Sequence, residues 1–584
     1  MDLVKRKNFY NKISYAGFVT IIILAACVIL GLYLLYDYNN KFRFSANSGF
    51  YENSFELKIL GSKNYDVYYT LDGSIPSVTS IKYNGPIQIN NRTYEPNEYA
   101  GREDVSTGFL TNRIELFSFD SEDPRYVAPQ YNVDKCTVVR AAIFDENGKN
   151  IEEISGVYFV GNELKEKYED ITVVSISMDY HDLFDYEDGI YVNGMDFDYY
   201  WEHFDTTIWA NEWWESYWYM WPANYRRTGM DSEREARIEI LDNNQNSIIS
   251  QNCGIRVQGD GSRGKLPRNL KIISREEYSG SEYFQKDLLN NGEYLHKYLL
   301  FGGADDNIFK IKDYLANSME SELNFATMKY KPCVLFLEGE YWGTYYITED
   351  YDEDYIQSYY NVPSDEVVIW KEGEIDQGTD EDLALYTDME TFITENDMSI
   401  EENYKKACEL IDINSFADYY AAQIFIGRCG DWPVGNEAAW RSRNINLNSK
   451  YQDGKWRWML FDLNSEYGDL EIEMLADDTL GGFTSEDTIL GSLLRNDEFK
   501  AFFCSRLQYI RDNIYSEDKI NAFIDGYLQD MLEPLCLSNM RFYSEEKRED
   551  IIENAENTRR FLIERRNYID KSIEVHFGEE LLDD

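Results

Sequence analysis

The sequence has little histidine and no closely spaced cysteine pair. Its 584 residues include four His, scattered along the chain, and eight Cys. Cys27 lies in an apolar run near the N-terminus, and the other seven cysteines are far apart with no Cys-x-x-Cys motif. An odd number at this spacing argues against a disulfide framework and against a cysteine-built zinc site. The scattered histidines argue against histidine-based metal chemistry.

Basic residues are also scarce. The chain has 56 Lys and Arg against 107 Asp and Glu, a formal net charge of −51. Residues 1–44 hold six of the basic and two of the acidic residues, so the remainder carries a net charge of −55. Such a surface repels nucleic acid and attracts basic partners; the alternative is that the acidity serves solubility alone. With 43% hydrophobic residues, the acidity does not indicate disorder.

One long apolar run stands near the N-terminus. Residues 13–36 carry no charge, and the run is long enough to cross a bilayer as a helix. It follows Lys5, Arg6, Lys7 and Lys12, a bias that puts the N-terminus in the cytoplasm and the chain beyond about residue 40 outside. A cleaved signal peptide is the alternative, but the run is long for one and no small-x-small cleavage site follows. We therefore expect a single-pass protein of the cell membrane with an extracellular C-terminal domain.

The chain has no internal repeat and no low-complexity tract, and its pattern changes along its length. Residues 45–163 alternate short strands with turns such as Asp72-Gly73-Ser74, which predicts a small β-sandwich. After a charged link, residues 170–350 mix strands and helices. From about residue 399 the pattern is largely helical. The architecture expected is an anchor at 1–44, a β-module at 45–163 and a larger α+β domain at 170–578.

A segment at 427–468 holds a pattern that phosphoryl transfer needs. Asp431 opens a short polar loop, Asn436 lies five residues on, and a predicted strand at 456–461 ends directly in Asp462. A protein kinase needs one carboxylate to take the hydroxyl proton, an Asn on one Mg²⁺ and an Asp on the metal at the end of a buried strand. An ordinary Asp in a turn after a strand would look similar.

A second candidate segment is rich in glycine. Gly261, Ser262 and Arg263 belong to a turn, GDGSRG at 259–264, between two predicted strands. Glycines let backbone N–H groups approach phosphates closely, and the arginine can fork onto phosphate oxygens. The alternative is an ordinary Gly-rich hairpin.

Four ordered blocks give the chain a resemblance to a known family. They are DLFDYEDGIYVNG (182–194), CGIRVQGDGSRGKLPRNLKIISR (253–275), LEGEYWGTYYITEDYDEDYI (337–356), and GDWPVGN followed by KWRWMLFDLNSEYG. In these blocks the chain resembles the CotH-type kinases, the spore-coat protein H family of atypical protein kinases. Residues 45–161, with YYTLDGSIPSVTSIKYNGPI, resemble the small β-domain at the C-terminus of chitobiases.

The resemblance implies roles for single residues. Asp431 would be the catalytic base, and Asn436 and Asp462 would hold Mg²⁺ or Mn²⁺ with ATP. The family usually has Asp-Leu-Asp at the strand end, whereas this chain has Asn464 at the third position. The loss of that carboxylate either weakens metal binding or marks a divergent member.

The sequence does not decide which basic residue contacts ATP. The family usually has a Lys after the proline that is Pro267 here, and Arg268 falls near that position with Lys271 three residues on. Glu349, at the end of a predicted strand, could pair with this cation, as a helical Glu does in ordinary kinases. A solvated strand end is the alternative for Glu349.

The function expected is that of an outward-facing, ATP- and Mg²⁺-dependent Ser/Thr protein kinase that acts on basic, Ser-rich proteins. A catalytically inactive kinase scaffold at the cell surface is the alternative, with the β-module touching cell-wall glycan or the chain binding a protein partner. Asp431, Asn436 and Asp462 favour the enzyme. The missing lysine and the outward topology, away from cytosolic ATP, favour the binding protein. No nucleic-acid partner is expected.

Overall fold

The computed structural model describes 41–62, 65–106, 126–203, 218–290, 294–428, 435–464 and 488–578, with Thr20, Gly292, Trp432 and Leu581. The apolar run predicted to span a membrane, 13–36, thus lies outside the described residues apart from Thr20. Within the described part of the chain, no helix is long and apolar enough to cross a membrane.

The N-terminal module is built of short strands around a small core. Its main sheet has the order β2-β9-β8-β5-β6, and two-stranded sheets β1-β4 and β3-β7 accompany it. Alternate side chains of β8, such as Val139 and Ala141, face this core because successive residues of a strand point to opposite faces. The strands are β1 (Arg43–Phe44), β2 (Gly49–Tyr51), β3 (Phe55–Leu57), β4 (Ile59–Leu60), β5 (Asp66–Thr70), β6 (Ile81–Lys82), β7 (Ile87–Ile89), β8 (Thr137–Phe144) and β9 (Asn150–Val160).

Helix α3 (Asn162–Lys167) leads into a closed barrel of seven strands, ordered β10-β11-β12-β13-β14-β16-β15. The ring closes where β10 and β15 pair in parallel, and all other neighbours are antiparallel. Closure leaves no open edge on this sheet. The strands are β10 (Thr172–Met178), β11 (Arg234–Leu241), β12 (Ser247–Val257), β13 (Leu270–Ile273), β14 (Lys297–Phe301), β15 (Tyr330–Leu337) and β16 (Glu340–Thr348).

The hairpin β15-β16 docks the barrel on the module. Its turn at Glu338-Gly339 has two positive φ angles, 52° and 77°, as a tight two-residue hairpin requires. Gly339 accepts a hydrogen bond from Cys136 N at 2.8 Å. A Cβ on Gly339 would lie 2.8 Å from the carbonyl oxygen of Cys136, so this contact needs a glycine. The turn predicted here from the sequence is confirmed.

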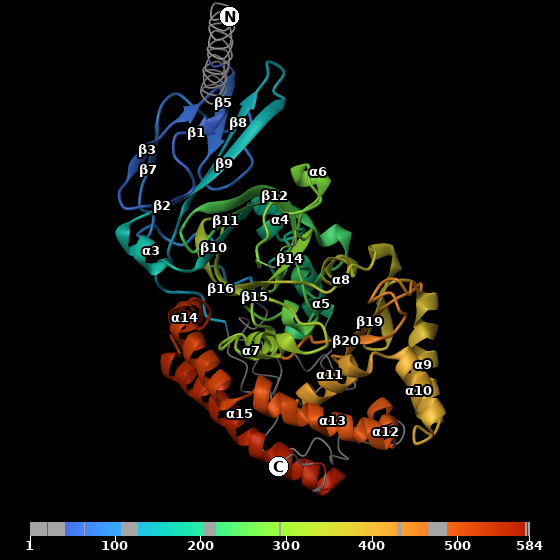
Figure 1. Ribbon diagram of the computed structural model, residues 1–584. Helices are drawn as coiled ribbons and strands as arrows, with labels where there is room; N and C mark the ends of the chain where they lie inside the picture. The colour runs from blue at the N-terminus through green and yellow to red at the C-terminus, as the bar shows by residue number, and fades with distance from the viewer. Residues whose placement is uncertain are drawn as a thin grey trace, which may run out of the picture.

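The C-terminal half is helical and carries a second small sheet, ordered β18-β17-β19-β20. Figure 1 shows the β-module at one end, the barrel in the middle, and α14 and α15 along the opposite end. The mixed α+β architecture predicted from the sequence is confirmed. The strands are β17 (Val367–Lys371), β18 (Glu374–Gln377), β19 (Ala438–Ser442) and β20 (Arg457–Met459).

The helices cover the barrel and build the second core. Helix α14 packs on β16, where Thr344 Oγ1 donates to Pro534 O at 2.7 Å. Four helices come between barrel strands in the sequence: α4 (Tyr180–Phe184), α5 (Gly194–His203), α6 (Glu276–Ser279) and α7 (Lys312–Met319). The later helices are α8 (Glu353–Tyr360), α9 (Leu383–Glu395), α10 (Glu401–Leu410), α11 (Ile413–Phe425), α12 (Ile489–Leu493), α13 (Asp497–Tyr509), α14 (Glu517–Tyr543) and α15 (Arg548–Phe577).

Candidate functional site

Asp462 lies three residues beyond β20, in a turn that is held from both sides. Its φ is +57°, an uncommon value for a residue other than glycine, so the surroundings have to maintain it. The buried Arg428 donates to the main-chain carbonyls of Phe461, at 3.3 Å, and Asp462. On the other side, Leu463 N donates to Asp313 Oδ1 at 3.0 Å. Two buried charged groups therefore fix the backbone that carries the predicted metal ligand.

Asn436 faces the carboxylate of Asp462. The backbone N–H of Asn436 donates to Glu372 Oε1 at 2.9 Å. When the side-chain nitrogen of Asn436 is turned toward the carboxylates, it donates to Glu372 Oε1 and to Asp462 Oδ2, each at 3.1 Å. Asn436 and Glu372 also have positive φ angles, +54° and +50°. The structure thus brings together both residues that the sequence predicted as metal ligands.

Further charged residues surround this pair. Asn464 donates from Nδ2 to Asp462 Oδ1, and its Oδ1 accepts from Asp305 N at 3.3 Å. Asp305 forms an ion pair with Lys265. Lys371 Nζ lies 4.2 Å from the centre of the Phe461 ring, beside Asp462. The site therefore gathers carboxylates from four separate segments of the chain.

Burial and neighbouring carboxylates raise the pKa of two carboxyl groups here. Burial raises the pKa of Asp462, and the charges of Arg428 and Lys371 with the hydrogen bond from Asn464 oppose this effect. Burial together with the charge of Asp462 raises the pKa of Asp313 to about 7. A divalent cation would relieve both effects, because it favours the ionised carboxylates. The donor set is made of oxygen atoms, the ligands that Mg²⁺ and Mn²⁺ prefer. The residues present therefore fit such an ion.

Asp431, the predicted catalytic base, lies outside the described residues. The chain on either side of it is anchored in the core. Arg428 binds the carbonyls at Asp462, as described above, and Trp432 is fully buried with its Nε1 donating to Tyr419 OH at 3.1 Å. Arg428 and Asn436, described residues before and after Asp431 in the sequence, thus both contact Asp462.

The Gly-rich turn contains the short 3-10 helix η6 (Gly261–Arg263) and packs against η3 (Trp218–Met220). A Cβ on Gly264 would lie 2.1 Å from the carbonyl oxygen of Tyr219, and one on Gly261 3.3 Å from the Tyr219 ring. These two glycines therefore permit close approach of another protein segment. Ser262 lies in the same turn and contacts the neighbouring Gly259, where an added Cβ would meet its hydroxyl at 2.0 Å.

Arg263 is buried and bonded to the backbone. Its guanidinium donates to the carbonyls of Val257 at 2.7 Å, Gly259 at 2.5 Å and Arg227 at 3.1 Å. Burial lowers the pKa of Arg263 to about 10. The cation of this block that is linked to the Asp462 site is instead Lys265, which forms an ion pair with Asp305, whose backbone N–H binds Asn464. Sequence reasoning missed Lys265, although it directly follows the glycine-rich run.

Arg268 and Lys271 are both buried, in different surroundings. The guanidinium of Arg268 lies 3.8 Å from the centre of the Tyr225 ring and 4.9 Å from that of Tyr191, and its Nε donates to Arg263 O at 2.7 Å. Lys271, on β13, forms an ion pair with Asp350 at 2.6 Å. The pair joins a barrel strand to the segment after β16.

Glu349, the predicted partner of that cation, is fully buried. Its carboxylate accepts from Lys329 N at 2.8 Å and from Tyr359 OH. The carboxylate that pairs with Lys271 comes from Asp350, the next residue. Successive residues of an extended chain point in opposite directions, so Glu349 and Asp350 face different surroundings. The predicted partner of the cation was therefore wrong by one residue.

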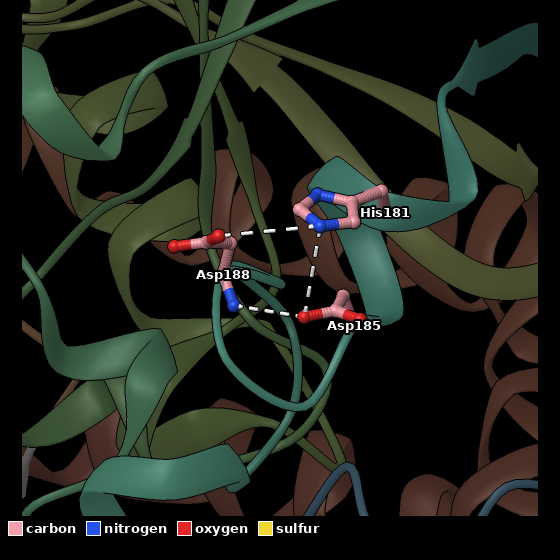
Figure 2. A group of neighbouring side chains, drawn as sticks. All are labelled: His181, Asp185 and Asp188. Carbon is pink, nitrogen blue, oxygen red and sulfur yellow. Dashed lines mark hydrogen bonds and ion pairs between the residues drawn. The ribbon is translucent and has the colours of Figure 1, made fainter.

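Two His-Asp groups lie apart from the Asp462 site. Figure 2 shows one of them, in which His181 Nε2 lies 3.9 Å from Asp185 Oδ1 and 4.0 Å from Asp188 Oδ2. Asp185 Oδ1 already accepts the backbone N–H groups of Glu187 and Asp188, at 2.8 and 3.2 Å. These backbone hydrogen bonds of the turn account for the position of Asp185, and the group of three side chains is largely exposed. The other group comprises His296, Asp352 and Asp354.

Comparison with known proteins assigns both parts of the chain. The family model described as CotH kinase protein matches residues 255–569, more than half of the chain. The model described as Fn3 associated matches residues 55–158, which form the β-module. This match supports a small associated β-domain, without singling out the chitobiase type that the sequence resemblance named. No curated protein matches the chain.

Proposed function

The chain belongs to the CotH kinase family, and from this premise we propose that it is an ATP- and Mg²⁺-dependent Ser/Thr protein kinase. One observation supports this proposal above the others. The side-chain amide of Asn436 and the carboxylate of Asp462, which the kinase pattern assigns to the metal, lie 3.1 Å apart. Both residues have a positive φ, and buried charged groups hold the backbone at Asp462 in this uncommon conformation, as expected of a functional site.

In the proposed reaction, the γ-phosphoryl group of ATP passes to a Ser or Thr hydroxyl oxygen and ADP leaves. Asp431 accepts the hydroxyl proton. Asn436 and Asp462 hold Mg²⁺, or Mn²⁺ in its place, which when bound neutralises charge on the phosphates. Arg428 keeps the carbonyl and carboxylate of Asp462 in position through its hydrogen bonds to that turn. The groups proposed to contact ATP are Lys265, Lys371 and the Gly-rich turn at Gly261. Either Arg268 or Lys271 is proposed to contact it as well.

The setting proposed for this activity is the outer face of a membrane. The uncharged run at 13–36 is the proposed anchor, and the Lys residues before it support an outward C-terminal domain. The net charge of −55 beyond residue 44 supports basic, Ser-rich proteins as substrates. The β-module is proposed to contact cell-wall glycan.

A second candidate function is binding without catalysis. It is favoured by the Gly-rich block, where Arg263 is bonded to three carbonyls and Arg268 is enclosed by tyrosine rings. Neither guanidinium is presented toward Asp462. On this reading the kinase scaffold serves as a surface protein for a glycan or protein partner.

One experiment distinguishes the two functions. The full chain in detergent is incubated with γ-labelled ATP, Mg²⁺ or Mn²⁺ and a Lys/Arg-flanked Ser peptide. We expect label in the peptide, and none with Asp431→Asn or Asp462→Asn. Nucleotide binding without label in the peptide would overturn the kinase proposal and favour the binding protein. The conservative substitutions keep the shape of both side chains, and a melting curve for each variant checks the fold.

A further inference from the structure

A buried carboxylate oxygen beside Asp462 has no hydrogen-bond partner among the described residues. Asp313, the second residue of α7, is 4% exposed. Its Oδ1 accepts from Leu463 N at 3.0 Å, whereas Oδ2 is enclosed and makes no hydrogen bond. Among the described residues Asp313 also forms no ion pair. A buried carboxylate oxygen without a donor or a cation is costly, so such an atom needs an explanation.

The nearby polar groups are largely engaged elsewhere, although Arg428 Nη1, like Asp313 Oδ2, makes no hydrogen bond among the described residues. Arg428 directs Nη2 to the carbonyls of Phe461 and Asp462. Asn464 donates its amide to Asp462 Oδ1. Asp313 binds the backbone N–H of Leu463, the residue next to Asp462, so the two carboxylates are neighbours, and among the described residues Asp313 Oδ2 forms no ion pair. A cation supplied from outside would satisfy both.

The residue at 464 gives the second observation. Where the family pattern has a second Asp, this chain has Asn464, which bridges Asp462 Oδ1 and Asp305 N through its two ends. An Asp at this place could accept from Asp305 N but would repel Asp462. The strand-end loop therefore has one carboxylate fewer than the family pattern, while α7 brings a carboxylate, Asp313, whose Oδ2 makes no hydrogen bond among the described residues.

We propose that Asp313 Oδ2 is an oxygen ligand of the divalent cation held by Asp462, and that it replaces the carboxylate missing at position 464. This inference rests on the proposed kinase function. Mg²⁺ and Mn²⁺ are bound through one or two carboxylates together with phosphate oxygens and water, so Asp313 and Asp462 complete such a set. Asn464 then serves to orient Asp462 rather than to bind the ion.

The test measures metal binding directly. The full chain in detergent with saturating ADP is titrated with Mn²⁺, and bound Mn²⁺ is followed by electron paramagnetic resonance. Asp313→Asn keeps the acceptor for Leu463 N but removes the charge, and we expect the Kd for Mn²⁺ to rise about tenfold or more. Adding Asn464→Asp to this variant should restore most of the affinity, because it returns the second carboxylate to the loop.

Glu320→Gln is the matched control. Glu320 follows α7, is fully buried and, like Asp313, has one hydrogen-bonded and one unpartnered carboxylate oxygen. Its Mn²⁺ affinity should equal that of the wild type. Should Asp313→Asn fail to fold, Asp313→Glu, which keeps the charge but displaces the oxygens, should also weaken binding.

The outcomes separate the two proposals. Unchanged Mn²⁺ affinity in a folded Asp313→Asn chain would overturn the role of Asp313, and so would a loss that Asn464→Asp does not restore. Neither result bears on kinase activity. Conversely, a wild-type chain that binds Mn²⁺ with ADP but labels no peptide would overturn the kinase proposal and leave Asp313 as a ligand. A wild-type chain that binds no Mn²⁺ would overturn both.

Discussion

Arg428 donates a hydrogen bond to the main-chain carbonyl of Asp462, a residue 34 positions further along the chain. The bond joins the end of α11 to the turn after β20. It also links the loop predicted to carry the catalytic base to the residue predicted to carry the metal. The first prediction follows from this contact.

Arg428→Gln should lower phosphoryl transfer by about 10- to 100-fold, or about 1.4–2.7 kcal/mol in transition-state stabilisation. The reason is that Asp462 has a φ of +57° and depends on its surroundings to keep that conformation. Mn²⁺ affinity should fall as well. The measurement is the rate of peptide labelling, with Arg495→Gln, a half-exposed arginine paired with Asp397, as the control. Equal rates for wild type and Arg428→Gln would show that the turn is held without this arginine.

Asp462→Ala should reduce ATP-dependent labelling by about 10³-fold or more, if the metal supplies about 4 kcal/mol of transition-state stabilisation. The measurement is labelling at saturating Mg²⁺ and ATP. Unchanged activity together with unchanged nucleotide affinity would remove Asp462 from the site.

The two lysines that pair with Asp350 should behave differently. Burial raises the pKa of Asp350, but Lys297 and Lys271 outweigh it and hold the pKa well below its usual range. Asp350→Asn leaves both cations without this partner, and we expect a loss of about 3 kcal/mol in the free energy of unfolding. If Lys271 contacts ATP, Lys271→Met lowers both stability and ADP affinity, whereas Lys297→Met lowers stability alone. Equal ADP affinity in the two variants would exclude Lys271 as the nucleotide contact.

Glu320 should make the chain less stable as the pH rises. Burial raises the pKa of Glu320 from its ordinary value of 4.5 to about 8. Between these two values the folded chain retains a proton that the unfolded chain has lost, so the free energy of unfolding falls with rising pH. Glu320→Gln removes this dependence and should raise the melting temperature by several degrees at pH 8 but little at pH 5. A gain that is the same at both pH values would contradict the assignment.

The sequence predicted the individual strands and helices better than it predicted the closed barrel that the strands form. The strands β10 to β13, the β15-β16 hairpin and helix α7 all follow from alternation, turn residues and helical periodicity. The closed barrel does not, because the parallel pairing of β10 with β15 joins segments about 160 residues apart in the chain. Local patterns carry no signal for such a contact.

The same limit applies to the site. Asp462 and Asn436 were recognised because they belong to one segment with family spacing. Glu372, Asp305 and Asp313 were missed, because each reaches the site from a different element and only the tertiary fold brings them together. Arg263 was predicted to contact phosphate because of the glycines around it, and Arg268 was one candidate for the ATP contact because it falls near the family's lysine position. Residue type alone does not reveal that both guanidinium groups are buried.

The last prediction concerns substrate charge. The chain beyond residue 44 carries −55, and kinase clefts select peptides by a complementary field. We expect Ser flanked by Lys or Arg to be phosphorylated far better than Ser flanked by Asp or Glu.

Salt is the control for this preference, because exposed charges are screened within about 10 Å at 0.1 M ionic strength. The ratio of kcat/KM for basic and acidic peptides should therefore shrink between low and high salt. A neutral Ser peptide, measured in parallel, should change little and so corrects for any effect of salt on the enzyme itself. Equal rates for basic and acidic peptides at low salt would show that the acidity serves solubility and not recognition.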